Sequence, residues 1–568
     1  RLIAKGAAND NYPFTWGSPA HIRDQYVHSL SQIGDLRMDE RSHESCVLYV
    51  NGEYWGVYDL REKVDDLDFL EYYYDQGEGN VDFLKTWGGT WTEFGDNTTQ
   101  QEWDDLVDFI VDNDMTVEAN YEYVKELYNT GSLIDYFILN SYVVAMDWLN
   151  WNTAWWRGKN PEGDKKKWRY ALWDMDATFG HYVNYTGIPE TGPEADPCDP
   201  EELGDPGGQG HVPILNSLFE NEDFAADYIN RYADLSNTIF SCDYMISHLD
   251  SLISIIEPEM PRQIDRWGGD LQDWEGNVQE LRDYILTRCS DIIVTGMEDC
   301  YDVEAIDLTV IIEGDGDVEV NSVELTPLNT PWSGIYYSGV PLQIEAFPDN
   351  LVNFYWEIIE GDAIIENTTD LETILSMVSG PVTIIAHFDA CELIETDLIM
   401  GPVEVFEGEI AQYSFSNQAQ NEAEWSVVGG EILWTSGFDN TIAVQWDYGI
   451  TEGEIIIAVS NEDGGIDCYT TTISIEDSPL GQDGVLNKFV QVFPNPFLEN
   501  LHIAHNLSGP LSILVFDQLG RVVFSDEAGL SVNGEGLHRL ALPSLDSGIY
   551  FVMIKGGGSE SVHTIKKM

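Results

Sequence analysis

Three carboxylates and an amide in the first third of the chain have the types and spacing of a magnesium–phosphate site. Asp147 lies five residues before Asn152, and Asp174 and Asp176 follow in the segment Trp-Asp-Met-Asp-Ala-Thr-Phe-Gly at 173–180. Phosphoryl transfer needs a carboxylate that orients the attacking hydroxyl and further oxygen ligands that hold Mg²⁺ on the nucleotide phosphates. Asp147 is the candidate for the first role, and the other three residues are candidates for the second.

The spacing matches that of a protein kinase only in part. Protein kinases place an Asn five residues after a catalytic Asp, and later an Asp directly before Phe-Gly. Here neither Asp174 nor Asp176 stands directly before Phe179. On a strand both carboxylates would face one side, whereas a turn would present them separately. Asn150 is a second candidate for the amide ligand, and a buried Asp that caps the loop is the alternative role for Asp147.

A strand-rich beginning and a helix-rich remainder are expected around these residues. Two apolar runs, 47–50 and 54–60, flank Asn51 and Gly52, a pair that favours a type I′ turn and predicts a β-hairpin. Asp147 comes shortly after an apolar helical segment, so it lies where a helix passes into a loop. Helical periodicity is present over residues 65–74, 103–113, 121–129, 132–144, 215–219, 224–240, 244–256 and 271–289.

Phosphates also need positive charge from the protein. Lys5 ends an expected strand over residues 2–5 and is placed like the phosphate-contacting lysine of a kinase, with a surface lysine as the alternative. Arg23 lies on an expected helix and either pairs with a carboxylate near the site or braces that helix. Glu62 follows Arg61 at the end of the hairpin, where a kinase hinge would meet adenine. The alternative for these two is an exposed ion pair, which adds little stability.

The segments around the candidate site resemble the secreted CotH kinase family. The matching sequences are Tyr-Val-Asn-Gly-Glu-Tyr-Trp-Gly-Val-Tyr-Asp-Leu-Arg-Glu at 49–62, Asn-Thr-Ala-Trp-Trp-Arg at 152–157, Trp-Arg-Tyr-Ala-Leu-Trp-Asp-Met-Asp at 168–176 and Met-Pro-Arg-Gln-Ile-Asp-Arg-Trp at 260–267. The resemblance implies an α+β, atypical protein-kinase-like domain over residues 1–300 that uses ATP with Mg²⁺ or Mn²⁺. It implies catalysis by Asp147, metal binding by Asn152, Asp174 and Asp176, and nucleotide contacts by Lys5, Arg23 and Glu62.

Charge excludes one class of partner. The 568 residues include 101 Asp and Glu against 26 Lys and Arg, a formal charge of −75, and no Lys or Arg occurs from Cys289 to Leu486. Such a surface repels phosphate backbones, so nucleic-acid binding is not expected. An acid-rich surface suits a salty medium that screens its self-repulsion, or it serves solubility alone.

Cysteine and hydropathy patterns bound the class of protein further. The seven cysteines show no C-x-x-C spacing, which argues against a zinc ribbon, and their odd number leaves at least one unpaired within the chain. In an exported protein, Cys289 with Cys300 and Cys391 with Cys468 are candidate disulfides, and the sequence leaves the connectivity open. No apolar run of 18 residues is present, so no transmembrane segment is expected. Because the chain begins at Arg1 without a signal peptide, a fragment or processed form is expected.

Helical periodicity ends near residue 300, and short strands with turns follow, which predicts all-β sandwich modules in series. Residues 303–390 resemble bacterial β-repeat modules, and 391–478 resemble a PKD-like or immunoglobulin-like sandwich. A polar linker is expected over 479–489. Residues 490–568 resemble the type IX secretion sorting domain of Bacteroidetes, through Val-Phe-Pro-Asn-Pro-Phe at 492–497, Ile-Leu-Val-Phe-Asp-Gln-Leu-Gly-Arg at 513–521, Leu-Asp-Ser-Gly-Ile-Tyr-Phe-Val at 545–552 and Thr-Ile-Lys-Lys at 564–567.

These observations lead to one function and one alternative. The resemblances imply an exported kinase that transfers the γ-phosphoryl group of ATP to Ser or Thr of extracellular or surface proteins, with the type IX secretion machinery as a further partner. They imply a protein that is secreted or attached to the outer-membrane surface. The alternative is a catalytically inactive, kinase-like adhesion or binding protein. A secreted hydrolase that uses the Asp cluster with a metal is a third and weaker hypothesis, because no nucleophile elbow, HExxH motif or paired Glu signature in this sequence supports it.

Overall fold

The computed structural model describes residues 1–14, 16–349, 353–389, 393–416, 423–436, 441–460, 466–476, 490–493, 497, 500–505, 509–516, 521–532, 536–542, 545, 547–556 and 559–567. The chain forms two compact units. The N-terminal unit comprises residues 1–349 and 354–388, and the C-terminal unit comprises residues 350–353 and 389–568.

Two small antiparallel sheets make up the strand-rich part of the N-terminal unit. One has the order β1-β3-β2, from β1 (Leu2–Lys5), β2 (His43–Val50) and β3 (Glu53–Glu62). The other has the order β5-β4-β6-β7, from β4 (Val81–Thr86), β5 (Thr90–Phe94), β6 (Thr153–Gly158) and β7 (Arg169–Leu172). Asn51 and Gly52 have φ values of 53° and 83°, as the type I′ turn requires, so the predicted hairpin is confirmed.

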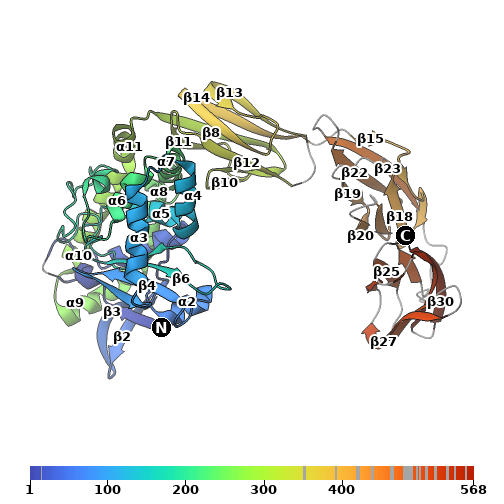
Figure 1. Ribbon diagram of the computed structural model, residues 1–568, viewed down its shortest axis with the longest axis horizontal. Coiled ribbons are helices and arrows are strands. Elements are labelled where there is room, and N and C mark those ends of the chain that lie inside the picture. Colours follow the sequence, from blue (N-terminus) through green and yellow to red (C-terminus); the bar gives the residue numbers. More distant parts are fainter. Residues whose placement is uncertain are drawn as a thin grey trace. The chain divides into compact units, whose positions relative to one another are not determined.

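Helices fill most of the remaining N-terminal unit (Figure 1). Side chains cap several of them: Asp66, Asn129, Asn221 and Asp270 each accept a backbone N–H of the first turn of the helix that follows. The helices are α1 (Arg23–Ile33), α2 (Leu67–Tyr74), α3 (Thr99–Asp112), α4 (Glu118–Leu127), α5 (Thr130–Tyr142), α6 (His211–Leu218), α7 (Glu222–Asn237), α8 (Cys242–Ile256), α9 (Met260–Trp267), α10 (Leu271–Thr287) and α11 (Ile293–Tyr301).

A larger sheet completes the N-terminal unit and packs on helix α7. Its order is β10-β9-β12-β14-β8-β11, with β13 paired to β14, from β8 (Ala305–Gly314), β9 (Gly316–Val320), β10 (Val323–Leu325), β11 (Trp332–Tyr337), β12 (Leu342–Pro348), β13 (Asn353–Ile365) and β14 (Glu372–Asp389). On α7, buried Asp234 accepts hydrogen bonds from the Ser322 backbone N–H at 3.1 Å, the Ser322 hydroxyl at 2.6 Å and the Tyr336 hydroxyl at 2.8 Å. Asn237 bonds both backbone groups of Ile335 at 2.9 Å. Side-chain hydrogen bonds of Asp234 and Asn237 therefore join the helix to the sheet.

Two disulfides link segments of the helical part of the N-terminal unit. They join Cys198 to Cys300 and Cys242 to Cys289, so the candidate pairing of Cys289 with Cys300 is wrong. Cys289 lies in the π-helical turn Arg288–Ile292 that follows α10, and its partner Cys242 begins α8, a neighbourhood that sequence spacing does not reveal. Cys46 is free, as the odd number requires. Cys468 is disulfide-bonded, and Cys391, its candidate partner, lies outside the described residues.

The C-terminal unit is built from strands. In its first half, the sheets β15-β23-β22-β19 and β16-β18-β21-β20 bury a shared core around Tyr413, Trp446 and Ile457. In its second half, the sheets β24-β25-β28 and β27-β26-β29-β30 share a core around Ile503, Val515 and Val552. The expected linker over 479–489 lies outside the described residues. An α+β part followed by all-β sheets confirms the predicted fold class, whereas the exact domain boundaries stay predictions.

The strands of this unit are β15 (Leu393–Glu395), β16 (Ile399–Met400), β17 (Glu404–Phe406), β18 (Ile410–Phe415), β19 (Ala423–Val428), β20 (Gly430–Ser436), β21 (Thr441–Trp446), β22 (Glu452–Ser460), β23 (Ile466–Glu476), β24 (Val490–Phe493), β25 (Asn500–His505), β26 (Gly509–Phe516), β27 (Val522–Val532), β28 (Gly536–Ala541), β29 (Gly548–Gly556) and β30 (Ser559–Lys567). Among the described residues no single helix is long and apolar enough to cross a membrane, although the bent pair Glu222–Asn237 and Cys242–Trp267 would reach that limit by length and composition.

Candidate functional site

The N-terminal strand and the loop after β7 meet at a cluster of charged side chains. Lys5, at the end of β1, forms an ion pair with Asp174 and donates to Asp24 Oδ2 at 2.6 Å. The Lys5 side chain is 15% exposed and that of Asp174 is 27% exposed. Burial works against the charged ammonium, but Asp174 and Asp24 raise the pKa of Lys5 above its usual value. Lys5 is therefore a charged partner of the predicted metal ligand Asp174.

Asp24, in the first turn of α1, organises this cluster. Its carboxylate accepts from Lys5, forms a buried ion pair with Arg61, and accepts the backbone N–H of Met175 at 2.7 Å. Burial opposes its charge, but Arg61 and Lys5 hold the pKa of Asp24 well below its usual value. The sequence did not reveal this role, since an Asp in the first turn of a helix is ordinary. Arg61, whose alternative was an exposed ion pair, is instead buried.

Asp176 lies beside this cluster and is fully buried. Its Oδ2 atom accepts the backbone N–H of Asn9 at 2.5 Å, and its Oδ1 atom has no hydrogen-bond partner. Burial and the neighbouring charge of Asp174 raise the pKa of Asp176 well above its usual value. A carboxylate in this state gains stability from a proton or from a cation.

Asp147 and Asn152 are joined by the loop that follows α5. The Asn152 side-chain N–H₂ donates to Asp147 Oδ2 at 2.9 Å and to the Asp147 carbonyl at 3.1 Å. The Asp147 Oδ1 atom is buried without a partner. Burial and the charge of Asp174 raise the pKa of Asp147 to about 6. The influence of Asp174 means that the predicted carboxylates share one electrostatic site.

Backbone strain gathers in the loops that carry these residues. Val144, Leu149 and Asn152 have φ values of 50°, 65° and 46°, and Phe179 has 51°. Positive φ is uncommon outside glycine, and for β-branched Val144 it is a marked outlier. Such strain persists only where surrounding contacts enforce it, and it concentrates at functional sites.

The structure keeps three other candidates out of the cluster. Arg23 is buried, bonds Asp10 Oδ1 at 2.6 Å and the Ser18 carbonyl at 2.9 Å, and so braces the start of α1. Glu62 accepts the hydroxyl of Tyr73 at 3.0 Å, and no hydrogen bond or ion pair between described residues joins it to Asp174. Asn150 donates to the Tyr185 carbonyl at 2.8 Å.

The donor set fits a hard cation that keeps most of its water ligands. Asp147 Oδ1 and Asp176 Oδ1 are buried acceptors without partners, and burial together with the charge of Asp174 raises the pKa of both carboxyl groups. Across the part of the chain that the structure describes, however, no three His, Cys, Asp or Glu side chains are grouped closely enough to hold a metal ion by themselves. Mg²⁺ commonly binds through one or two carboxylates together with waters and phosphates, so Asn152, Asp174 and Asp176 are compatible with it.

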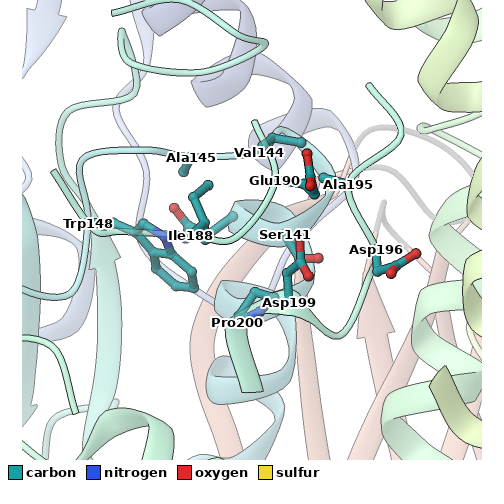
Figure 2. Close-up of a pocket in the computed structure, with 11 residues that line it drawn as sticks. Ser141, Val144, Ala145, Trp148, Ile188, Glu190, Ala195, Asp196, Asp199 and Pro200 are labelled. Carbon is teal, nitrogen blue, oxygen red and sulfur yellow. The ribbon is translucent and has the colours of Figure 1, made fainter. Parts of the chain in front are cut away.

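A small cavity lies beside the loop that carries Asp147 (Figure 2). Its volume is about 10 Å³, close to the lower limit for one water molecule. Three of its lining residues carry polar atoms that are buried without partners, namely Asn140 Oδ1, Trp148 Nε1 and Asp199 Oδ2. The cavity is far too small for a nucleotide, so it does not compete with the carboxylate cluster as a nucleotide site.

Comparison with known proteins identifies two domains. Residues 15–291 match the family model of the CotH kinase protein, and residues 491–568 match that of the secretion system C-terminal sorting domain. This is an exported protein with a kinase-family domain. It carries a CotH kinase domain and a type IX secretion sorting domain, which confirms both resemblances, and the sorting domain makes it secreted or attached to the outer-membrane surface.

Similar solved structures include the Bacteroides ovatus glucan utilization protein SGBP-B, at 12% identity and a TM-score of 0.13, covering 46% of this chain and 66% of that one. Latent PorU from Porphyromonas gingivalis matches at 10% sequence identity and a TM-score of 0.18, and the match covers 47% of this chain and 29% of that one. The fibronectin(III)-like modules of Clostridium thermocellum CbhA match at 12% sequence identity and a TM-score of 0.12, and the match covers 30% of this chain and 93% of that one. The chain thus spans less than two thirds of the first two proteins. No curated protein matches this chain.

Proposed function

We propose that this protein is an exported kinase that transfers the γ-phosphoryl group of ATP to Ser or Thr hydroxyls of extracellular or surface proteins. The observation that carries the proposal is the convergence of Asp147, Asp174 and Asp176 with Lys5, within the residues that match the CotH kinase model. An unpartnered Asp176 oxygen near the charge of Lys5, and an unpartnered Asp147 oxygen near the charge of Asp174, suit a phosphate with its metal ion.

In this reaction the acceptor hydroxyl oxygen bonds to the γ-phosphorus while the bond from that phosphorus to the β–γ bridging oxygen breaks, and ADP leaves. The hydroxyl proton passes to Asp147, whose carboxylate is held by Asn152. Its pKa of about 6 lies close to the range in which a general base works well. Mg²⁺ or Mn²⁺, held by oxygens of Asn152, Asp174 and Asp176, would supply charge that offsets the phosphates.

Lys5 would provide positive charge at the same place. Its ammonium lies against Asp174 and Asp24 and keeps its charge despite burial. Such a contact to phosphate oxygens is charge-assisted and therefore stronger than a neutral hydrogen bond. On a chain with a formal charge of −75, phosphate binding requires local compensation of this kind.

The test is transfer of label from γ-labelled ATP to a generic protein acceptor by the full chain, with Mg²⁺ or Mn²⁺. Asp147→Asn and Asp174→Ala should abolish transfer, while Asp105→Asn, an exposed change on α3, should retain it. Retention of full activity by both site variants would overturn the proposal. If the wild-type chain neither binds ATP nor transfers label, the kinase-like adhesion or binding protein is the better description.

A further inference from the structure

Arg41 is a buried cation whose guanidinium has no hydrogen-bond or ion-pair partner within the part of the chain that the structure describes. The residue is 4% exposed, and its Nε atom is shielded from solvent without a hydrogen bond. Among the described residues its guanidinium makes no ion pair, and its one hydrogen bond runs from the backbone N–H to His28 Nδ1 at 3.2 Å. A buried charge without a partner is costly, so this position calls for an explanation.

Other buried Lys and Arg side chains of the N-terminal unit are paired. Arg23 pairs with Asp10, Arg169 with Asp39 and Lys85 with Asp65, Arg61 pairs with two aspartates, and Arg288 donates to backbone carbonyls. The N-terminal unit therefore pairs its buried cations as a rule, and Arg41 departs from that rule.

The position of Arg41 places it beside the candidate site. Asp39 forms a parallel bridge with Ala171 of β7, so two residues further on Arg41 is level with Trp173, the neighbour of Asp174. His28 connects the two segments, because it accepts the Arg41 N–H at Nδ1 and contacts the Trp173 carbonyl through Nε2 at 3.2 Å.

Carboxylates near Arg41 are already committed to other cations. Asp24, Asp65 and Asp174 act on the Arg41 charge, but Asp24 pairs with Lys5 and Arg61, Asp65 with Lys85, and Asp174 with Lys5. These acids hold Arg41 in a favourable field without occupying its five N–H donors. Solvent reaches this cluster at Asp174, 27% exposed, so a ligand can approach from that side.

We propose that Arg41 is a phosphate-binding residue of this site, whose guanidinium donates to phosphoryl oxygens of the nucleotide. The planar fork of arginine matches two oxygens of a phosphate, which a lysine cannot do. Lys85, which pairs with Asp65, lies with its ammonium 5.0 Å from the centroid of the Trp173 ring. This inference rests on the proposed function, because it assumes that the phosphates belong to a nucleotide.

The experiment measures binding of ATP, ADP and inorganic pyrophosphate, each with Mg²⁺, to the full chain by isothermal titration calorimetry. Hydrogen bonds to a charged group contribute about 1.5–3 kcal/mol, so Arg41→Gln should weaken ATP binding about tenfold to a hundredfold. Arg41→Lys keeps the positive charge but loses the planar fork of N–H donors, so its affinity for ATP should lie between those of the wild type and Arg41→Gln. Arg262→Gln, an exposed arginine on α9, is the matched control and should bind as the wild type does.

Thermal unfolding without ligand separates a binding role from a structural one. Removal of an unpaired buried charge should leave the melting temperature of Arg41→Gln equal to or above that of the wild type. If Arg41→Gln binds ATP as tightly as the wild type, the inference is wrong while the kinase proposal stands. If the wild type binds pyrophosphate in an Arg41-dependent way but not ATP, Arg41 binds phosphate that does not belong to a nucleotide, and both the inference and the kinase proposal are wrong. If the wild type binds none of the three, both are wrong.

A structure of the wild-type chain with ADP and Mg²⁺ provides a test that needs no variant. A phosphate oxygen within hydrogen-bond distance of the Arg41 guanidinium supports the inference. Phosphates held elsewhere overturn it, even where Arg41→Gln fails to fold.

Discussion

Individual carboxylates at the site are held in states that cost stability. Burial and Asp174 raise the pKa of Asp147 to about 6 and that of Asp176 well above its usual value. The folded protein therefore disfavours the charges that the proposed reaction needs. Enzymes commonly accept such a cost at their active sites, which is why the cluster stands out from the paired carboxylates elsewhere.

Asp147→Asn should stabilise the protein at neutral and alkaline pH. Because the pKa of Asp147 is higher in the folded state than in the unfolded state, the folded state binds more protons between about pH 4 and pH 6, and its stability falls as pH rises through that window. The side chain is partly solvated, so a gain of about 1 kcal/mol in the free energy of unfolding is expected at pH 8. Urea unfolding of both proteins at pH 8 and near pH 4 measures it, and a variant that is less stable at pH 8 would contradict the argument.

The rate of phosphoryl transfer should also follow the ionisation of Asp147, but it should rise with pH where the stability of the protein falls. If Asp147 accepts the hydroxyl proton, kcat/KM rises about tenfold per pH unit below pH 6 and levels off above it. A pH–rate profile between pH 4.5 and pH 8.5 measures this. A profile that is flat across pH 6 would remove Asp147 from the role of base.

At the scale of elements, the sequence predicts the turns and helices whose formation depends on neighbouring residues. The hairpin at Asn51 and Gly52 follows from a turn that needs positive φ, and the expected helices are present because their apolar faces have the helical period. The contact between Lys5 and Asp174 is different, because the two residues are 169 positions apart. Spacing identified Asp174 as a candidate and the place at the end of an expected strand identified Lys5, but only folding brings the two side chains together.

The site residues that the sequence missed share one reason. Asp24 and Arg61 have ordinary surroundings in sequence, and their roles arise from tertiary pairs between α1 and β3. Glu62 is the opposite case, because its place at the end of the hairpin made it a candidate for nucleotide contact. The alternation of side chains along β3 instead buries its neighbour Arg61. One residue of register decides which of two adjacent side chains reaches the cluster.

The interface between α7 and the β8–β14 sheet should depend on Asp234. Asp234→Ala leaves the Ser322 and Tyr336 donors buried without an acceptor, which should lower the free energy of unfolding by about 2–4 kcal/mol. Burial raises the pKa of Asp234, so Asp234→Asn, which retains one oxygen acceptor, should cost less. Chemical denaturation of the two variants beside the wild type tests this, and equal losses would show that hydrogen-bond acceptance is not what Asp234 contributes.

At the scale of the whole molecule, two disulfides restrain the helical part. They close sequence separations of 102 and 47 residues, for which chain entropy predicts roughly 4–5 kcal/mol each. Reduction should therefore lower the melting temperature of the N-terminal unit, and Cys242→Ser with Cys289→Ser should reproduce part of that loss. Scanning calorimetry with and without reductant measures it. An unchanged melting temperature would mean that the bonds add nothing to stability, and export into an oxidising environment would then not explain them.

Truncated chains should show that the stability of the helical part depends on the β8–β14 sheet and not on the C-terminal unit. A chain ending at residue 389 keeps strand β14 paired in parallel with β8 and keeps the contacts of Asp234 and Asn237, so it should retain the melting temperature of the N-terminal unit. A chain ending at residue 303 loses those contacts and exposes buried residues of α7, so it should melt at a lower temperature or aggregate. Both lack the sorting domain and should fail to be exported. Calorimetry of the purified chains and fractionation of cells provide the measurements. If the shorter chain melted like the longer one, the β8–β14 sheet would be a passive spacer and the polar interface on α7 would contribute no stability.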